Sequence, residues 1–237
     1  MICFENVSIA YEKGSPVLSG LSFTIENAEA VGLIGANGSG KTTLMRVLLG
    51  LMPYEGTVTV DGLPVRKENL REIRKKIGLV LQNSDSQMFM PTVYEDIMFA
   101  PLNYGMSREE AEKRTDDVLE KLGLTELKHR HNHKISGGEK RMAAIATVLA
   151  MDPEAMIMDE PTSALDPYNR RVVINTIRSL PNTKLIASHD LDMILDTCDR
   201  VILLGGGGIA ADGPAEKVLQ DRELLETNRL ELPLRYQ

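Results

Sequence analysis

The sequence predicts an α/β protein built on a mainly parallel β-sheet, interrupted by a mostly helical insert. Short apolar runs typical of buried strands alternate along the chain with stretches whose apolar residues recur at helical spacing. A glycine-rich loop joins one of these apolar runs to a helical stretch. Because strands that alternate with helices favour parallel pairing, we expect helices on both faces of the sheet.

The N-terminal third contains the first strands and the first helix. Two β-rich runs at residues 2–9 and 21–26 precede a compact apolar strand at 30–34, and helical spacing follows over 42–51. Another strand, closed by a turn, is expected at 56–62, and a buried one at 77–81.

The middle of the chain has helical spacing instead. A helix is predicted from Ser107 to Leu122, because Ser107 and Glu110 form a capping-box pattern. A second helix follows Ser136, so residues 86–150 are predicted to be a mostly helical insert. Two buried strands at 155–158 and 184–187 then flank a helix near 169–180. A strand at 200–204 and short helices after Pro214 complete the chain.

Composition excludes several classes of protein. Of 237 residues, 43% are hydrophobic and 26% charged, which is the balance of a globular protein. No apolar stretch is long enough to cross a bilayer and the N-terminus lacks a signal-peptide pattern, so we expect neither a membrane span nor export. With 27 Lys and Arg against 34 Asp and Glu, nucleic acid is not the expected partner. Cys3 and Cys198 form neither a metal spacing nor a disulfide framework, which favours a reducing cytoplasm.

A phosphate-binding loop lies between the strand at 30–34 and the following helix. The segment GANGSGKT matches G-x-x-x-x-G-K-[ST]. Its glycines let backbone amides curl around an anion at a helix N-terminus. Lys41 adds a full charge near the β- and γ-phosphates, and the Thr42 hydroxyl can ligate Mg²⁺.

Two carboxylates follow the strand at 155–158. In a parallel sheet, the C-terminal ends of the strands face the ligand crevice, so Asp159 and Glu160 are expected beside the phosphate-binding loop. There, Asp159 can hold Mg²⁺ through its water shell, and Glu160 can polarise the attacking water.

A second anion-binding helix start is predicted at Ser136, Gly137 and Gly138. Ser136 is a good N-cap, and the glycines leave the first amides open to an anion. One chain needs a single phosphate loop for its γ-phosphate. The simplest interpretation is that this second helix start serves a nucleotide held by another subunit.

With these motifs in order, the sequence resembles the ATP-binding subunits of ABC transporters, in which the P-loop of one chain and the Ser-Gly-Gly signature of its partner enclose each ATP. The resemblance covers essentially the whole chain. It implies a P-loop NTPase (RecA-like) core at about 1–85 and 151–237, with an N-terminal antiparallel β-subdomain and a helical signature subdomain at about 86–150. It also implies an ATP-hydrolysing enzyme that uses ATP and Mg²⁺.

The resemblance implies a set of site residues. Glu160 and His189 would be catalytic, Thr42, Gln82 and Asp159 would hold Mg²⁺, and Asp166 would belong to the D-loop. The implied ATP-binding residues are Tyr11, Gly35, Asn37, Gly38, Ser39, Gly40, Lys41, Thr42, Thr43, Gln82 and Asp159, and those for the partner's ATP are Ser136, Gly137 and Gly138.

Three of these residues also have a plain structural interpretation. Tyr11, implied to stack on adenine, can be an edge-strand aromatic residue, because the sequence does not give its direction. Gln82 can be a polar strand end, and His189 a loop histidine without catalytic contact. The signature also departs from the family pattern, with Ile135 for the commoner leucine and Glu139 for glutamine, so the role of Glu139 stays open.

Residues 82–103 resemble the ATPases of energy-coupling-factor importers, which take up cobalt, nickel and vitamins. In those systems this region docks a transmembrane subunit, and Met88, Phe89, Met90 and Met98 would suit an apolar socket. The alternative is that they form the small core of the helical insert. The nearby His129, His131 and His133 are interpreted as a solvated loop and not as a metal site.

The function expected from the sequence is ATP hydrolysis that powers micronutrient uptake. The chain would form a homo- or heterodimer with another ABC ATPase and close head to tail on ATP. It would work with a transmembrane coupling subunit and a substrate-binding membrane subunit at the cytoplasmic face of the cell membrane. The alternative is a soluble ABC ATPase that acts as a nucleotide-gated switch on a non-membrane partner. ABC ATPases with long coiled-coil insertions are excluded, because only 95 positions of sequence separate Lys41 from Ser136.

Overall fold

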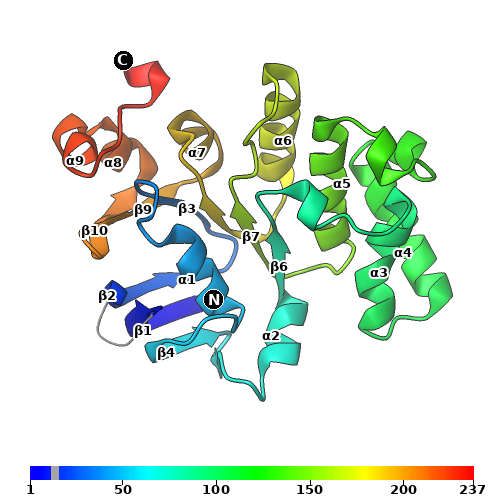
Figure 1. The fold of residues 1–237 in the computed structure, drawn as a ribbon, viewed down its shortest axis with the longest axis horizontal. Coiled ribbons are helices and arrows are strands. Elements are labelled where there is room, and N and C mark those ends of the chain that lie inside the picture. Colours follow the sequence, from blue (N-terminus) through cyan, green and yellow to red (C-terminus); the bar gives the residue numbers. More distant parts are fainter. Residues whose placement is uncertain (12–15) are drawn as a thin grey trace.

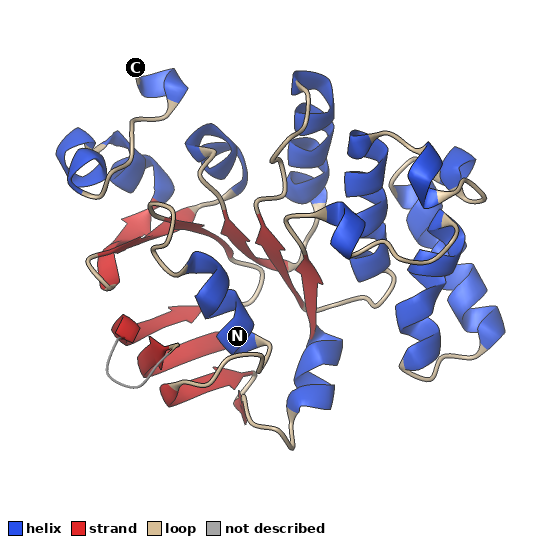
Figure 2. Ribbon diagram, viewed as in Figure 1, coloured by secondary structure: helices blue, strands red, loops and turns tan. Residues whose placement is uncertain are grey.

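The computed structural model of the protein, which describes residues 1–11 and 16–237, contains two β-sheets and a group of helices at one side (Figure 1). Figure 2 shows the strands in two groups, a small sheet near the N-terminus and a larger central sheet. Within the described ranges, no helix has the length and apolarity that a membrane crossing requires.

The small sheet is antiparallel and has the order β2-β1-β4-β5. Its strands are β1 (Ile2–Ala10), β2 (Pro16–Ile25), β4 (Glu55–Val60) and β5 (Leu63–Pro64). Phe4 pairs with Phe23 across β1 and β2, and their rings stack with centroids 4.5 Å apart. This is the N-terminal antiparallel subdomain that the resemblance implies.

The central sheet has the order β10-β9-β3-β8-β7-β6, and all its pairs are parallel except β10 with β9. Its strands are β3 (Ala30–Ile34), β6 (Ile77–Val80), β7 (Ala155–Asp159), β8 (Thr183–Ala187), β9 (Arg200–Gly205) and β10 (Gly208–Pro214). Strands β3 and β7 flank β8, so the loops after them open at the same edge of the sheet.

The two faces of the central sheet pack differently because side chains alternate along each strand. Met156 and Met158 of β7 belong to one core, whereas Ile157 belongs to the other. Helices cover the first face, and helix α1 together with the small sheet covers the second. Helices therefore lie on both faces, as expected, and on the second face the small antiparallel sheet packs beside them. The helices are α1 (Lys41–Leu48), α2 (Leu70–Lys76), α3 (Val93–Asn103), α4 (Arg108–Lys121), α5 (Gly137–Leu149), α6 (Pro167–Ser179), α7 (Leu191–Thr197), α8 (Ala215–Gln220) and α9 (Arg222–Thr227).

Capping boxes fix the helices between residues 86 and 150. The predicted box at Ser107 and Glu110 is present at the start of α4, and a second one at Thr92 begins α3. Helix α5 begins after Ser136, as predicted, and lies against both α3 and β6. The three helices form the group at the right of Figure 1.

Some boundaries differ from the sequence-based expectation. Helix α1 ends at Leu48, short of the predicted residue 51, because Gly50 adopts a left-handed φ of 65° and its amide donates to the Val47 carbonyl. Strand β10 was not predicted, because its sequence GIAADGP is poor in β-branched residues and the strand depends on its ladder with β9. Strand β6 is only half-buried at Gly78 and Leu79, because it lies at the edge of the sheet.

Candidate functional site

The glycine loop between β3 and α1 curls tightly above the end of the sheet. Gly35 has a φ of 149°, and a Cβ on it would lie 2.5 Å from the Leu204 carbonyl oxygen. Gly40, with a φ of 99°, would bring a Cβ to 2.7 Å from Leu18. Only glycine meets both conditions without a shift of neighbouring atoms. The loop leads directly into the N-terminus of α1 at Lys41, and an anion binds favourably at such a helix start.

The Lys41 ammonium group is tucked under this loop. It donates to the carbonyl oxygens of Gly35, at 2.7 Å, and Ala36, at 3.3 Å. The side chain is buried, with 8% of the residue exposed. Burial lowers the pKa of Lys41, while the charges of Glu160 and Asp159 oppose that shift. A cation so placed is available to phosphate oxygens in the loop.

Thr42 and Asp159 bring oxygen atoms from two elements together. The Thr42 hydroxyl at the start of α1 donates to Oδ2 of Asp159, at the end of β7, over 2.9 Å. Burial raises the pKa of Asp159, although the hydrogen bond from Thr42 acts in the opposite direction. A hydroxyl, a carboxylate and the nearby Gln82 amide are the hard oxygen donors that suit Mg²⁺.

Glu160 sits in a strained and almost fully buried position. Its φ is 48°, a left-handed value that is uncommon for a non-glycine residue. Its carboxylate accepts hydrogen bonds from the Ser188 hydroxyl, at 2.9 Å, and from the His189 amide, at 3.1 Å. The side-chain Nδ1 of His189 also lies 2.9 Å from Oε2 of Glu160. The end of β8 thus holds the Glu160 carboxylate in one orientation.

One cavity of about 640 Å³ collects most of the residues that the sequence singled out. The P-loop, Gln82, Asp159, Glu160 and His189 all line it. Tyr11 lies at its rim, 60% exposed, and its hydroxyl is 2.8 Å from that of Thr43. This cavity also contains residues that sequence reasoning missed, Val17, Arg229 and Leu230. Arg229 and Leu230 belong to no motif, and only the folding of the C-terminal segment brings them to the cavity.

The signature residues Ser136, Gly137 and Gly138 are not part of this cavity. Ser136 and Gly137 are exposed at the start of α5, as an anion site for a second chain requires. Gly138 is buried, and a Cβ on it would lie 2.1 Å from Cγ of Asn169 in α6. Asp166 caps that helix by accepting the Asn169 amide at 3.0 Å. The signature is therefore packed directly on the helix that follows Asp166.

Glu139 has a local structural role. Its carboxylate accepts the Ser136 amide at 2.7 Å, while the Ser136 hydroxyl oxygen accepts the Glu139 amide at 3.2 Å. Hydrogen bonds to this carboxylate from the Ser136 amide and, less strongly, from the Ser136 hydroxyl lower the pKa of Glu139. Glu139 therefore serves the capping box that begins α5.

The residues considered for a docking socket divide between core and surface. Met88 and Met98 are buried, so the expectation that they contribute to a socket is wrong, and Met90 is half-buried. Phe89 and Phe99 are 61% and 41% exposed, and their rings meet edge to face at 4.8 Å. In the loop before the signature, the His131 and His133 rings stack at 5.4 Å and His129 lies against Tyr94.

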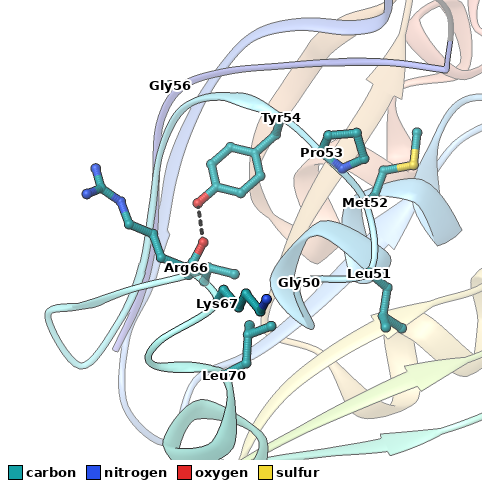
Figure 3. Close-up of a pocket in the computed structure, with 10 residues that line it drawn as sticks. Gly50, Leu51, Met52, Pro53, Tyr54, Gly56, Arg66, Lys67 and Leu70 are labelled. Atoms are coloured by element: carbon teal, nitrogen blue, oxygen red, sulfur yellow. Dashed lines mark hydrogen bonds between the residues drawn. The ribbon is translucent and has the colours of Figure 1, made fainter.

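A second cavity of about 680 Å³ lies away from the phosphate loop, between the end of α1 and the chain around Tyr54 (Figure 3). The Tyr54 hydroxyl donates to the Val65 carbonyl there. Among the residues that the structure describes, its lining includes no ionisable group besides Tyr54, Arg66 and Lys67. Although slightly larger, this cavity lacks the paired acids and the anion-binding helix start of the first, so we place the chemistry in the first.

A parallel sheet that presents a phosphate loop and a carboxylate pair to one cavity defines the class: this is a P-loop nucleotide hydrolase. Within that class, the ABC transporter family description matches residues 18–163. An ABC transporter ATP-binding protein of Geobacter sulfurreducens is 46% identical over 96% of this chain and 92% of its own length. The chain therefore belongs to the ABC transporter family, as an ATP-hydrolysing, ATP-binding subunit.

Other relatives indicate the subtype. The energy-coupling factor transporter ATP-binding protein EcfA of Methanothermobacter thermautotrophicus is 41% identical over 98% of this chain and 77% of its own length. The solved structure of cbiO1 from Clostridium perfringens, part of the cbiONQ ABC transporter complex, superposes with a TM-score of 0.86. It is 31% identical and covers 95% of this chain and 93% of that one. The resemblance to energy-coupling-factor ATPases is thereby confirmed.

Proposed function

We propose that this subunit powers the uptake of a micronutrient, a transition-metal ion or a vitamin, through a separate membrane subunit. The observation that carries the proposal is the separation of two phosphate-binding elements. The P-loop and acidic pair share one cavity, whereas Ser136 and Gly137 face outward elsewhere. In a head-to-tail dimer, the signature of each chain would complete the nucleotide site of the other. Bound ATP would then contact both chains and stabilise the closed dimer.

Within one chain, the phosphates of ATP would lie on the P-loop amides beside Lys41. Thr42, Gln82 and Asp159 would hold Mg²⁺, which neutralises charge on the phosphates when it is bound. The short distance between Thr42 and Asp159 supports this assignment, because it gathers two oxygen donors within reach of one small cation. Tyr11 would lie against the nucleotide from the rim of the cavity.

Glu160 would orient the attacking water and accept its proton. Its carboxylate is fixed by donors from Ser188 and His189, so little reorganisation is needed when the water attacks. His189 is mostly exposed at the mouth of the cavity, where its side chain would donate to the γ-phosphate. The partner's signature would neutralise the remaining charge on that phosphate.

The membrane subunit would dock beside Phe89 and Phe99. An apolar cavity of about 220 Å³ lies there between α2, α3 and α5, and both phenylalanine side chains line it. Exposed aromatic residues of this kind are typical of interaction sites. The subunit would then lie at the cytoplasmic face of the cell membrane as a peripheral protein, and the membrane subunit, not lipid, would hold it there.

The transport proposal is tested by purification from the native operon with a tag on this chain. We expect a transmembrane protein and a small substrate-binding membrane protein to co-purify, and Phe89→Asp to abolish their capture. Phe89→Asp should leave ATP binding of the isolated chain unchanged, because Phe89 is outside the nucleotide cavity. Capture of no membrane protein, together with tight binding of RNA or DNA at physiological salt, would replace transport with a switch on a non-membrane partner.

A further inference from the structure

Arg141, on the second turn of α5, bonds directly to the loop that carries Gln82. Its guanidinium donates to the carbonyl oxygen of Leu81, at 2.6 Å, and to that of Gln82 itself. These carbonyls follow the end of β6, and each accepts a guanidinium hydrogen from a helix that begins at the signature. The link therefore joins an element of this chain's own nucleotide cavity to the element that faces the partner's nucleotide.

Gln87 makes a second link between the same two elements. Its side-chain oxygen accepts the Leu81 amide at 2.9 Å, and its side-chain nitrogen donates to the Ala144 carbonyl at 2.7 Å and to the Thr147 hydroxyl at 2.9 Å. With Arg141 on one side and Gln87 on the other, residues 81 and 82 are bonded to α5 at two separate turns. A loop held in this way moves with the helix.

Burying the charged side chain of Arg141 costs free energy that a residue with only a packing role would not need to spend. The residue is 4% exposed, both of its described partners are carbonyl oxygens and not carboxylates, and its Nε is buried without a partner among the residues that the structure describes. Burial lowers the pKa of the guanidinium, which reflects the cost of removing the charge from water. In other proteins, well-packed apolar residues often replace a complete buried ion pair without loss of stability, so a buried charge is by itself weak evidence of a stabilising role.

We propose that Arg141 is a positioning residue that couples Gln82 to the signature helix. When ATP and Mg²⁺ engage Gln82 in one chain, the Arg141 link would turn α5 and so orient Ser136 and Gly137 toward the nucleotide of the partner. Each chain would then present its signature only when its own cavity is filled, which makes closure depend on occupancy of both sites. The inference rests on the proposed contact of Gln82 with bound nucleotide and metal.

The test compares Arg141→Met with Gln82→Ala, the double variant and the wild type, all as purified full chains. Arg141→Met keeps an unbranched side chain, shorter than that of arginine, and removes both donors. We expect turnover at saturating ATP to fall at least tenfold and the Mg²⁺ concentration for half-maximal activity to rise. The dissociation constant for ATP should change less than twofold. In the Gln82→Ala background, Arg141→Met should cause no further loss, because both substitutions break the same path.

Two further variants separate positioning from folding. Arg74→Met is the matched control, since Arg74 also donates through Nε and Nη2 to a single carbonyl, that of Leu49, but lies outside the nucleotide cavity. It should leave turnover and the Mg²⁺ profile unchanged. Arg141→Lys, which retains the charge but can reach one carbonyl, should give an intermediate Mg²⁺ profile, and it serves if the methionine variant does not fold.

The outcomes distinguish the inference from the proposal beneath it. If Gln82→Ala lowers turnover but Arg141→Met and Arg141→Lys do not, the coupling is wrong and the role of Gln82 stands. Additive losses in the double variant also overturn the coupling. If Gln82→Ala has no effect, both the assigned role of Gln82 and the coupling fail.

Discussion

The Nδ1 atom of His189 lies 2.9 Å from Oε2 of Glu160, and the backbone amide of His189 donates to the same carboxylate. The two residues follow adjacent parallel strands, β7 and β8, at the same edge of the sheet. Their contact is therefore a consequence of topology, and it fixes the carboxylate that would receive a proton from water. The left-handed backbone of Glu160 is kept in place by the hydrogen bond from its amide to the Ala187 carbonyl.

Replacing the carboxylate of Glu160 should separate binding from hydrolysis. Glu160→Gln keeps an oxygen for the Ser188 and His189 donors but cannot accept a proton from water. We expect turnover to fall about 10²–10⁴-fold, the usual range for loss of a general base, with ATP binding retained. Size-exclusion chromatography with ATP should then reveal an accumulated dimer. A variant that hydrolyses ATP at the wild-type rate would remove Glu160 from the mechanism.

Gly138 should tolerate no side chain while Asn169 is present. A Cβ at Gly138 would lie 2.1 Å from Asn169 Cγ, and Asn169 is held by its hydrogen bonds to Asp166. Gly138→Ala should therefore destabilise the fold by about 1–3 kcal/mol, as overpacking usually does, measured by urea denaturation.

Gly137 provides the matched control for this substitution. Apart from its chain neighbours and the backbone of its own helix, no atom of the described residues lies within 4 Å of a Cβ built on Gly137, so Gly137→Ala should leave stability unchanged or slightly raise it. Adding Asn169→Ala to Gly138→Ala should restore most of the lost stability. If Gly138→Ala unfolds at the same urea concentration as Gly137→Ala, the packing between α5 and α6 is not as tight as the structure has it.

Asp190 should stabilise the protein through its charge. Burial alone would raise the pKa of Asp190, but hydrogen bonds from Arg170 and the Met193 amide outweigh it and hold the pKa below its usual value. Because the folded-state pKa is depressed, this stabilisation is complete above the unfolded value of about 4 and is lost as pH falls through the folded value.

Asp190→Asn tests this sign, because the amide oxygen can still cap α7 while the charge is removed. We expect a loss of about 1 kcal/mol at pH 7, typical of a charge-assisted hydrogen bond that is partly exposed. The loss should shrink as urea denaturation is repeated at pH values below 4. A difference between variant and wild type that stays constant from pH 7 to pH 3 would contradict the assignment.

Local sequence predicted those parts of the fold in which periodicity and capping agree with the final packing. Helix α4, for example, has both helical spacing and a Ser107 capping box, and its bounds match the prediction within a residue. Strand β10 has weak strand propensity of its own, and the local signal that the prediction missed is the Gly206-Gly207 turn, whose positive φ values suit a two-residue hairpin. Strands β9 and β10 form a hairpin in which only Gly206 and Gly207 separate them, so the pairing depends on the turn and not on the strand propensity of residues 208–214.

The same division applies to the site. Motifs predicted Lys41, Asp159 and Glu160 as site residues, because phosphate chemistry constrains which residues can stand at those positions, and the structure brings all three to one cavity. Arg141 and Ser188 act through neighbours, on carbonyls and on a carboxylate, and many residue types can fill such positions, so no pattern marks them. Glu139 departs from the family pattern but retains the capping function, because glutamate accepts the Ser136 amide as glutamine would.

Arg229 should contribute to ATP affinity although no motif contains it. It has a left-handed φ of 60° and lines the nucleotide cavity beside the P-loop residues Ala36 to Ser39. A guanidinium at this position would attract the phosphates of ATP. We expect Arg229→Ala to weaken ATP binding about tenfold, which corresponds to about 1.4 kcal/mol, with turnover at saturating ATP largely retained.

Arg222→Ala is the matched control, because Arg222 pairs with Glu226 on the surface of α9 and is not among the residues that line the nucleotide cavity. Equal ATP affinity in the two variants, measured by titration calorimetry, would show that Arg229 bounds the cavity without binding its contents.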